Sequence, residues 1–107
     1  MTNTNTLKVG DKFYEPYYSF KYPAPYKVVV NIKCCEYIVT DVIVTQSNKG
    51  IKVTYVDDSN WKKYKHNSKR IYLKPFTDEE ALEILNKYVK YRNKNSSYHY
   101  IVGEYVK

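Results

Sequence analysis

The chain has 107 residues, with 18 Lys and Arg against 11 Asp and Glu, for a formal net charge of +7. Two halves of such a chain would each be too small to bury a core, which favours one domain. Hydrophobic residues make up 43%, which excludes a disordered composition. The positive charge favours an acidic partner, either nucleic acid or an acidic protein surface.

The first six residues, M-T-N-T-N-T, lack the basic and apolar regions of a signal peptide. We expect residues 1–6 to form a flexible tail and residues 7–107 to form a single domain. No apolar run approaches the roughly 18 residues that a membrane helix needs. We therefore expect a cytoplasmic protein.

Strand-forming residues dominate the first half of the chain. A first strand is predicted over residues 7–15. Residues 16–26, P-Y-Y-S-F-K-Y-P-A-P-Y, hold three prolines, which lack the amide donor of a ladder, and this predicts an ordered aromatic loop. Residues 26–46 are almost all strand formers, and their length predicts a break near Lys33 to Glu36.

Turn signals follow this long run. S-N-K-G at residues 47–50 predicts a hairpin turn with Gly50 at positive φ, and a strand then runs to Val56. Asp57 and Asp58 are expected in the next turn.

The decapeptide W-K-K-Y-K-H-N-S-K-R, residues 61–70, has five cations, two large aromatics and no acid. If it binds nucleic acid, Trp61 and Tyr64 stack on bases while the cations neutralise phosphates. The cations are Lys62, Lys63, Lys65, Lys69 and Arg70. If the aromatic loop lies beside this segment, Tyr17, Tyr18, Phe20 and Tyr22 add a second stacking surface. The alternatives are a protein interface made by the same residues, and a solvated loop with Trp61 folded onto the sheet.

Two features of composition favour a protein partner. Sixteen of the 18 cations are Lys, whereas base readout and bidentate phosphate binding draw on Arg. Fourteen tyrosines exceed what so small a core can hold, so several are expected on the surface, where a partner would cover them. The predicted helix offers another surface, acidic at its start and basic at its end.

The C-terminal part gives the clearest local signal. Thr77 followed by Glu80 forms a capping box, and the apolar spacing that follows predicts an amphipathic helix over about residues 77–92. Its apolar side is expected to include Leu82, Leu85 and Arg92. A final strand is predicted over about residues 98–106. The fold class is therefore mainly β (α+β), with about five strands and one helix.

This order of elements resembles small proteins encoded by phages and prophages. The matching residues are Val9, Gly10, Asp11, Phe13, Tyr14, Ile71, Tyr72, Leu73, Phe76, Thr77, Glu79, Glu80 and Ala81. The resemblance implies an SH3-like curled antiparallel sheet or barrel. It also implies a small binder of a bacterial host protein or ribonucleoprotein complex, of the kind that includes anti-CRISPR and other anti-defence inhibitors. The Lys74-Pro75 insertion and the strand after the helix depart from the pattern.

Catalytic and metal-binding patterns are weak. His66 and His99 are expected to be surface or strand histidines, and no glycine-rich phosphate loop is present. Cys34 and Cys35 point to opposite faces of a strand and poorly suit one metal; two reduced thiols are expected, and a strained vicinal disulfide is the alternative. We expect no catalytic residue, no metal and no cofactor. The expected function is protein binding, and the alternative is binding of single-stranded or nonspecific nucleic acid.

Overall fold

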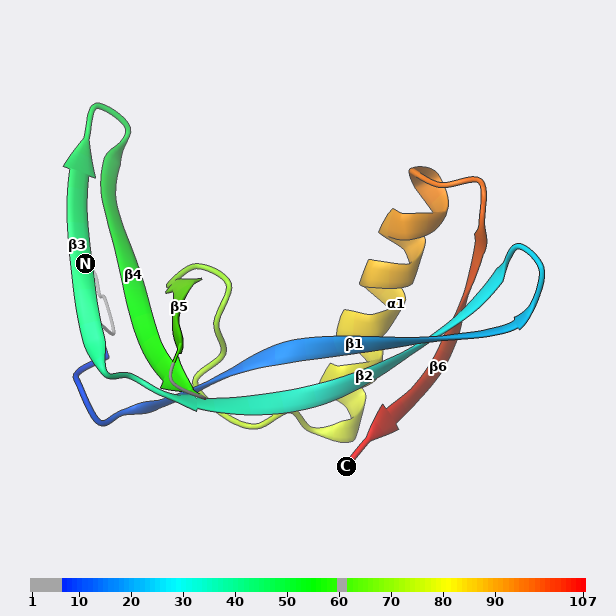
Figure 1. The fold of residues 1–107 in the computed structure, drawn as a ribbon, viewed down its shortest axis with the longest axis horizontal. Helices are drawn as coiled ribbons and strands as arrows, with labels where there is room; N and C mark the ends of the chain where they lie inside the picture. Colours follow the sequence, from blue (N-terminus) through cyan, green and yellow to red (C-terminus); the bar gives the residue numbers. More distant parts are fainter. Residues whose placement is uncertain (1–6, 60–61) are drawn as a thin grey trace. The chain divides into compact units, whose positions relative to one another are not determined.

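The computed structural model describes residues 7–59 and 62–107 of the chain (Figure 1). Its elements, in chain order, are β1 (Lys12–Ala24), β2 (Lys27–Ile38), β3 (Asp41–Ser47), β4 (Gly50–Ser59), β5 (Lys62–Asn67), α1 (Asp78–Lys94) and β6 (His99–Val106). They divide into two compact units. The described part of the β3–β5 unit is residues 7–15, 36–59 and 62–74, and the helical unit is residues 16–35 and 75–107. The predicted tail, residues 1–6, lies outside the described residues.

The mainly β fold with one helix near its C-terminal end is confirmed, but the barrel is not. The described strands form two open sheets, in the orders β1-β2-β6 and β3-β4-β5. The expectation of a wholly antiparallel sheet is also wrong, because β6 pairs parallel with β2. Parallel neighbours need a long crossover, and here everything between β2 and β6 forms that connection.

The segment predicted as an aromatic loop is a strand. β1 runs through Pro16 and Pro23 to Ala24, and only Pro25 and Tyr26 form the turn before β2. Proline is tolerated here because β1 lies at the edge of its sheet, where half of the amide groups need no ladder partner. The rule that excludes proline from central strands does not apply to an edge.

Other strand boundaries also differ from those predicted from the sequence. The long run of strand formers breaks at residues 39–40, after the predicted position, and β4 continues through Asp57 and Asp58, which were expected in a turn. The first strand begins at Lys12, because Gly10 adopts a φ of 97° in a turn. The hairpin turn before Gly50, which has a φ of 116°, is confirmed.

Each unit has its own core. In the β3–β5 unit, Phe13, Val39 and Tyr55 are buried against one another. In the helical unit, α1 lies over the sheet beside β6 (Figure 1). Its buried residues recur at helical spacing, and alternate residues of β2 are buried in the same unit. These residues are Ala81, Leu85 and Val89 of α1, and Val28, Val30 and Ile32 of β2.

The helix forms as predicted. Thr77 is the N-cap: its hydroxyl accepts a hydrogen bond from the Glu80 amide at 3.1 Å, and the Glu80 carboxylate accepts one from the Thr77 amide at 3.0 Å. The helix extends to Lys94, two residues beyond the prediction. Leu82, expected on the apolar side, is 42% exposed.

The pairing of β2 with β6 contains an irregularity that Gly103 makes possible. The register shifts between Val30 and Ile32, and buried Asn31 uses its side-chain oxygen to accept the Glu104 amide at 2.9 Å. A Cβ atom at position 103 would lie 2.1 Å from that oxygen and 2.6 Å from the Val30 carbonyl oxygen. Glycine is therefore required for close approach at this bulge.

Candidate binding surfaces

The basic decapeptide contributes an edge strand, β5, to the β3–β5 unit. Trp61 and the side chain of Lys62 lie outside the described residues. Lys63, Tyr64 and Lys65 are exposed on the strand. Because side chains of a strand alternate, Tyr64 points to the face opposite to Lys63 and Lys65. The described aromatic ring of this segment and these two lysines therefore do not share a face.

One lysine of β5 lies opposite an acidic residue in the sheet. Lys63 lies opposite Asp58 in the register of β4 and β5. Lys69 and Arg70 are exposed in the turn that follows β5. The positive strip predicted from the sequence is thus divided between a strand and a turn, with an acid beside its first described lysine.

The predicted aromatic surface belongs to the other unit. Tyr17 and Tyr22 are exposed on β1, on opposite faces of the strand by alternation. Tyr18 is half-buried and stacks on Tyr88 of α1, with ring centroids 3.8 Å apart and planes at 8°. Phe20, two residues further on, also contacts Tyr88. Tyr18 therefore holds the helix on the sheet, while Tyr17 and Tyr22 remain available at the surface.

Arg92 lies among these rings, a cluster that sequence reasoning missed. Its guanidinium donates a 2.7 Å hydrogen bond to the Tyr100 hydroxyl, and its Cζ atom lies 4.9 Å from the centroid of that ring. The ring centroids of Phe20 and Tyr88 each lie 5.9 Å from the Arg92 Cζ atom. This hydrogen bond raises the pKa of Arg92 and lowers the pKa of Tyr100. Helical spacing placed Arg92 on the apolar side, but only the fold supplies its aromatic neighbours.

A second missed cluster lies in the β3–β5 unit. His66, expected to be a surface or strand histidine, lies in β5 with a side chain only 10% exposed, and Asp57, expected to cap a turn, is 6% exposed. His66 Nδ1 contacts the Glu15 carboxylate, and His66 Nε2 lies 3.9 Å from Asp57 Oδ2. Phe13 packs edge-on against the imidazole at 4.9 Å between ring centroids. These residues come from three strands, β1, β4 and β5, so the cluster fastens them together.

The cysteines are the remaining candidates for a reactive or metal-binding site. Cys34 and Cys35 are free and half-buried, without a disulfide. Burial and the neighbouring Cys34 raise the pKa of Tyr105. Within the described parts of the chain, no group of three or more His, Cys, Asp or Glu is placed to hold a metal ion. The same parts contain no helix that is long and apolar enough to cross a membrane.

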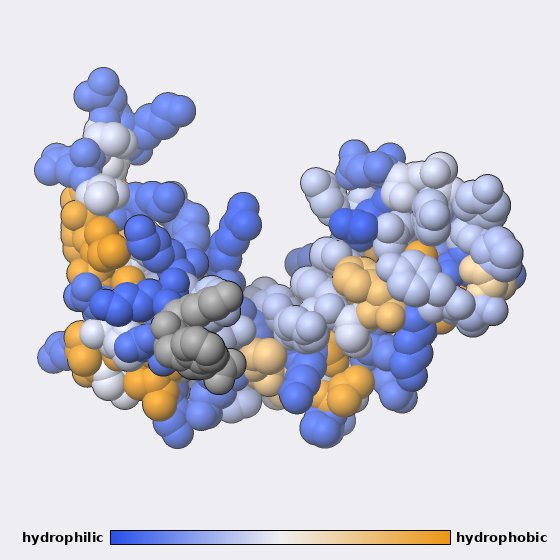
Figure 2. All heavy atoms as spheres, in the orientation of Figure 1, coloured by the Kyte–Doolittle hydropathy of each residue, from blue (hydrophilic) through white to orange (hydrophobic). Residues whose placement is uncertain are grey.

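Exposed apolar and aromatic side chains are unevenly distributed. On the face shown in Figure 2, hydrophobic residues gather over β3, where Val44 is exposed. Seven tyrosines are exposed among the described residues: Tyr17, Tyr22, Tyr26, Tyr64, Tyr72, Tyr91 and Tyr98. Five of these seven lie in the helical unit. Comparison of the chain with protein-family models, with curated proteins and with solved structures found no match.

Proposed function

We propose that the chain is a non-enzymatic protein-binding module. In this proposal it is an inhibitor of the anti-CRISPR or anti-defence kind, related to small phage proteins with SH3-like curled sheets. It docks on a protein or ribonucleoprotein complex in the cytoplasm of a bacterial host. The observation that carries protein binding is the set of exposed tyrosines on the helical unit. Rigid aromatic rings supply most of the binding energy in many protein interfaces.

Tyr26 is the exposed tyrosine that supports protein binding most directly. Its backbone has a φ of 62°, in the left-handed region, which costs a non-glycine residue roughly 1–2 kcal/mol. Glycine would form this turn with less strain, yet the position holds a tyrosine that is 68% exposed and touches Tyr98 edge-on at 5.6 Å. Strained positions that retain a large exposed side chain are typical of functional surfaces.

Affinity capture from a nuclease-treated bacterial lysate tests the proposal. We expect the tagged protein to retain a protein partner at about 0.5 M NaCl, because contacts made by buried rings are little affected by screening. A triple variant, Tyr22→Ala, Tyr26→Ala and Tyr91→Ala, should lower the captured amount about tenfold, because exposed tyrosines supply much of the binding energy of such interfaces. Capture that is unchanged in this variant would refute a tyrosine-based interface.

A matched control separates aromatic contact from charge. The double variant Lys21→Ala and Lys27→Ala removes exposed cations from the same hairpin and keeps its tyrosines. We expect its captured amount to equal that of the unmodified protein at high salt. A loss as large as that of the tyrosine variant would show that charge carries the interaction.

The alternative function is binding of single-stranded or nonspecific nucleic acid, favoured by the net charge of +7 and by exposed Lys63, Lys65, Lys69 and Arg70. Labelled oligonucleotides on a sizing column at low and moderate salt test it. Binding through phosphates falls steeply with salt and should disappear in a Lys63→Ala, Lys65→Ala variant. A complex of this kind would promote the alternative over the protein-binding proposal.

A further inference from the structure

Strand β6 is the edge of its sheet. It pairs with β2 on one side, and among the described residues no strand pairs with its other side. An unpaired edge presents amide and carbonyl groups that can bind another extended chain. α1 runs beside β6 and contacts it directly.

Hydrogen bonds show which residues of β6 face outward. The His99 amide donates to the Tyr26 carbonyl at 2.7 Å, so His99 faces β2. Since backbone groups alternate along a strand, Tyr100 and Val102 face the open edge. Asn93 of α1 already binds Tyr100 as a strand would: it accepts from the amide at 2.6 Å and donates to the carbonyl at 3.0 Å. The next outward position, Val102, continues the same edge without such a side chain.

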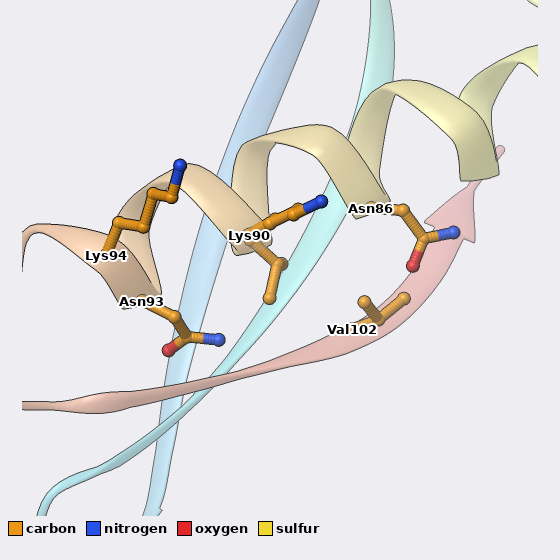
Figure 3. A pocket seen from close by; sticks show the side chains of 6 residues that line it. Asn86, Lys90, Asn93, Lys94 and Val102 are labelled. Atoms are coloured by element: carbon orange, nitrogen blue, oxygen red, sulfur yellow. The ribbon is translucent and has the colours of Figure 1, made fainter.

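A groove lies at this place. It has a volume of about 570 Å³ and is lined by Asn86, Val89, Lys90, Asn93, Lys94 and Val102. Figure 3 shows the labelled polar side chains along α1 and Val102 opposite them on β6. Val102 is 36% exposed, and with Val89 it gives the groove an apolar base.

The charge of the groove indicates its ligand. Lys90 and Lys94 are its only charged lining residues, and neither forms an ion pair within the described residues. Two acids of the helix form ion pairs away from these lysines: Glu83 pairs with Lys87 at 3.3 Å, and Asp78 pairs with Lys107. Two uncompensated ammonium groups beside an apolar floor complement a carboxylate-bearing chain.

We infer that this groove binds an extended acidic peptide segment of a partner protein, which adds to the edge of β6. The segment's backbone bonds the Val102 amide and carbonyl, one of its apolar side chains contacts Val89 and Val102, and its carboxylates meet Lys90 and Lys94. This is recognition by strand addition, in which the backbone gives affinity and the flanking pocket gives selectivity. The inference rests on the proposed function and names the chemistry of its partner.

The test uses a library of octapeptides with two fixed acidic residues and otherwise random sequence, incubated with the full chain. A second library, with lysine at the fixed positions, is the control. We expect at least about tenfold enrichment from the acidic library. The bound peptides should shift the Val102 amide resonance in a nitrogen–proton spectrum. Equal enrichment from both libraries, or none from either, would overturn the inference.

Variants then locate the contact. Lys90→Ala with Lys94→Ala should weaken the best peptide about tenfold, whereas Lys87→Ala, on the same helix but outside the groove, should leave its affinity unchanged. Val102→Pro removes an amide that faces the open edge, so no ladder bond of the sheet is lost. If that variant fails to fold, N-methylation of the peptide backbone removes the same hydrogen bonds from the other side. Binding that survives N-methylation at every position would rule out strand addition.

The tyrosine variant distinguishes this inference from the function on which it rests. If the acidic peptides fail but capture still depends on Tyr22, Tyr26 and Tyr91, the groove is wrong and protein binding stands. If both fail, the proposed function fails as well.

Discussion

The two units bury their interiors by different means. In the helical unit, α1 turns an apolar stripe inward, and aliphatic side chains such as Leu85 and Val30 are fully buried. The described part of the β3–β5 unit has no helix. There Phe13 and Tyr55 supply the core, and the polar strand β5 turns His66 inward between Glu15 and Asp57.

The amino-acid composition of its strands determines how a small sheet can bury its interior. A helix offers one face at a repeat of 3.6 residues, so aliphatic residues alone can close the interface. A sheet whose last strand is K-K-Y-K-H-N has no such stripe, and its interior must include polar groups that partner one another. Substitutions at Leu85 and His66 test whether the helical unit depends on packing while the β3–β5 unit depends on its polar cluster, and two smaller effects sharpen the description of the helical unit.

The largest effect is expected in the helical core. Leu85→Ala removes a fully buried side chain from α1 and should lower the free energy of unfolding by about 2–5 kcal/mol, through lost burial and the cavity left behind. Urea denaturation, followed through amide resonances of both units, measures it. Leu82→Ala, on the exposed side of the same helix, is the matched control and should cost less than about 1 kcal/mol. Equal costs would contradict the assignment of faces.

The next effect concerns the polar cluster. His66→Ala leaves the Glu15 and Asp57 carboxylates without the imidazole that lies between them, and should cost about 1–3 kcal/mol. His99→Ala, at an exposed strand position, should stay within about 0.5 kcal/mol. The same denaturation experiment compares the two. A cost for His66→Ala as small as that for His99→Ala would mean that the cluster contributes little to the β3–β5 unit.

A smaller effect is expected at the helix N-terminus. Thr77→Ala removes the hydroxyl that accepts from the Glu80 amide and should destabilise the protein by about 1 kcal/mol. Thr77→Ser keeps that acceptor and should recover most of the loss. Thermal unfolding monitored by circular dichroism distinguishes them. A serine variant as unstable as the alanine variant would assign the loss to the methyl group instead of the cap.

The smallest effect is a dependence on alkaline pH. The Arg92 hydrogen bond lowers the pKa of Tyr100, and burial raises the pKa of Tyr105. The lowered pKa means that the Tyr100 phenolate is favoured in the folded state. The free energy of unfolding therefore increases as pH rises through the folded-state pKa of Tyr100, and the increase is complete above the ordinary tyrosine pKa of about 10. Tyr105 has the opposite effect: folding opposes its ionisation, so the free energy of unfolding decreases as pH rises above the ordinary tyrosine pKa.

Carbon NMR of ring-labelled tyrosine resolves the two titrations. Tyr100→Phe should remove a resonance that titrates below about 10, and Tyr105→Phe one that titrates above it. Arg92→Met should move the Tyr100 titration upward, toward the ordinary value. A Tyr100 resonance that titrates unchanged in Arg92→Met would show that the guanidinium is not the cause.

The sequence by itself determined the local features. Thr77 with Glu80 predicted the start of α1, S-N-K-G predicted the turn between β3 and β4, and the alternation after residue 98 predicted β6. Capping and tight turns depend on residues within four positions of one another, so their signals are complete in a short stretch of chain. The surplus of tyrosine likewise predicted exposed rings, which seven of them confirm.

Only the tertiary structure decided what depends on distant partners. Pro16 lies in a strand because β1 is an edge, and β6 is parallel because it pairs with β2 across a long crossover. His66 is buried because Glu15, 51 residues away in the chain, turns a carboxylate toward it. The groove beside Val102 is lined by residues of α1 and β6, and Asn93 of α1 binds the edge of β6 at Tyr100. None of these pairings has a local signal, since each is set by which elements meet in space and not by the residues next to them.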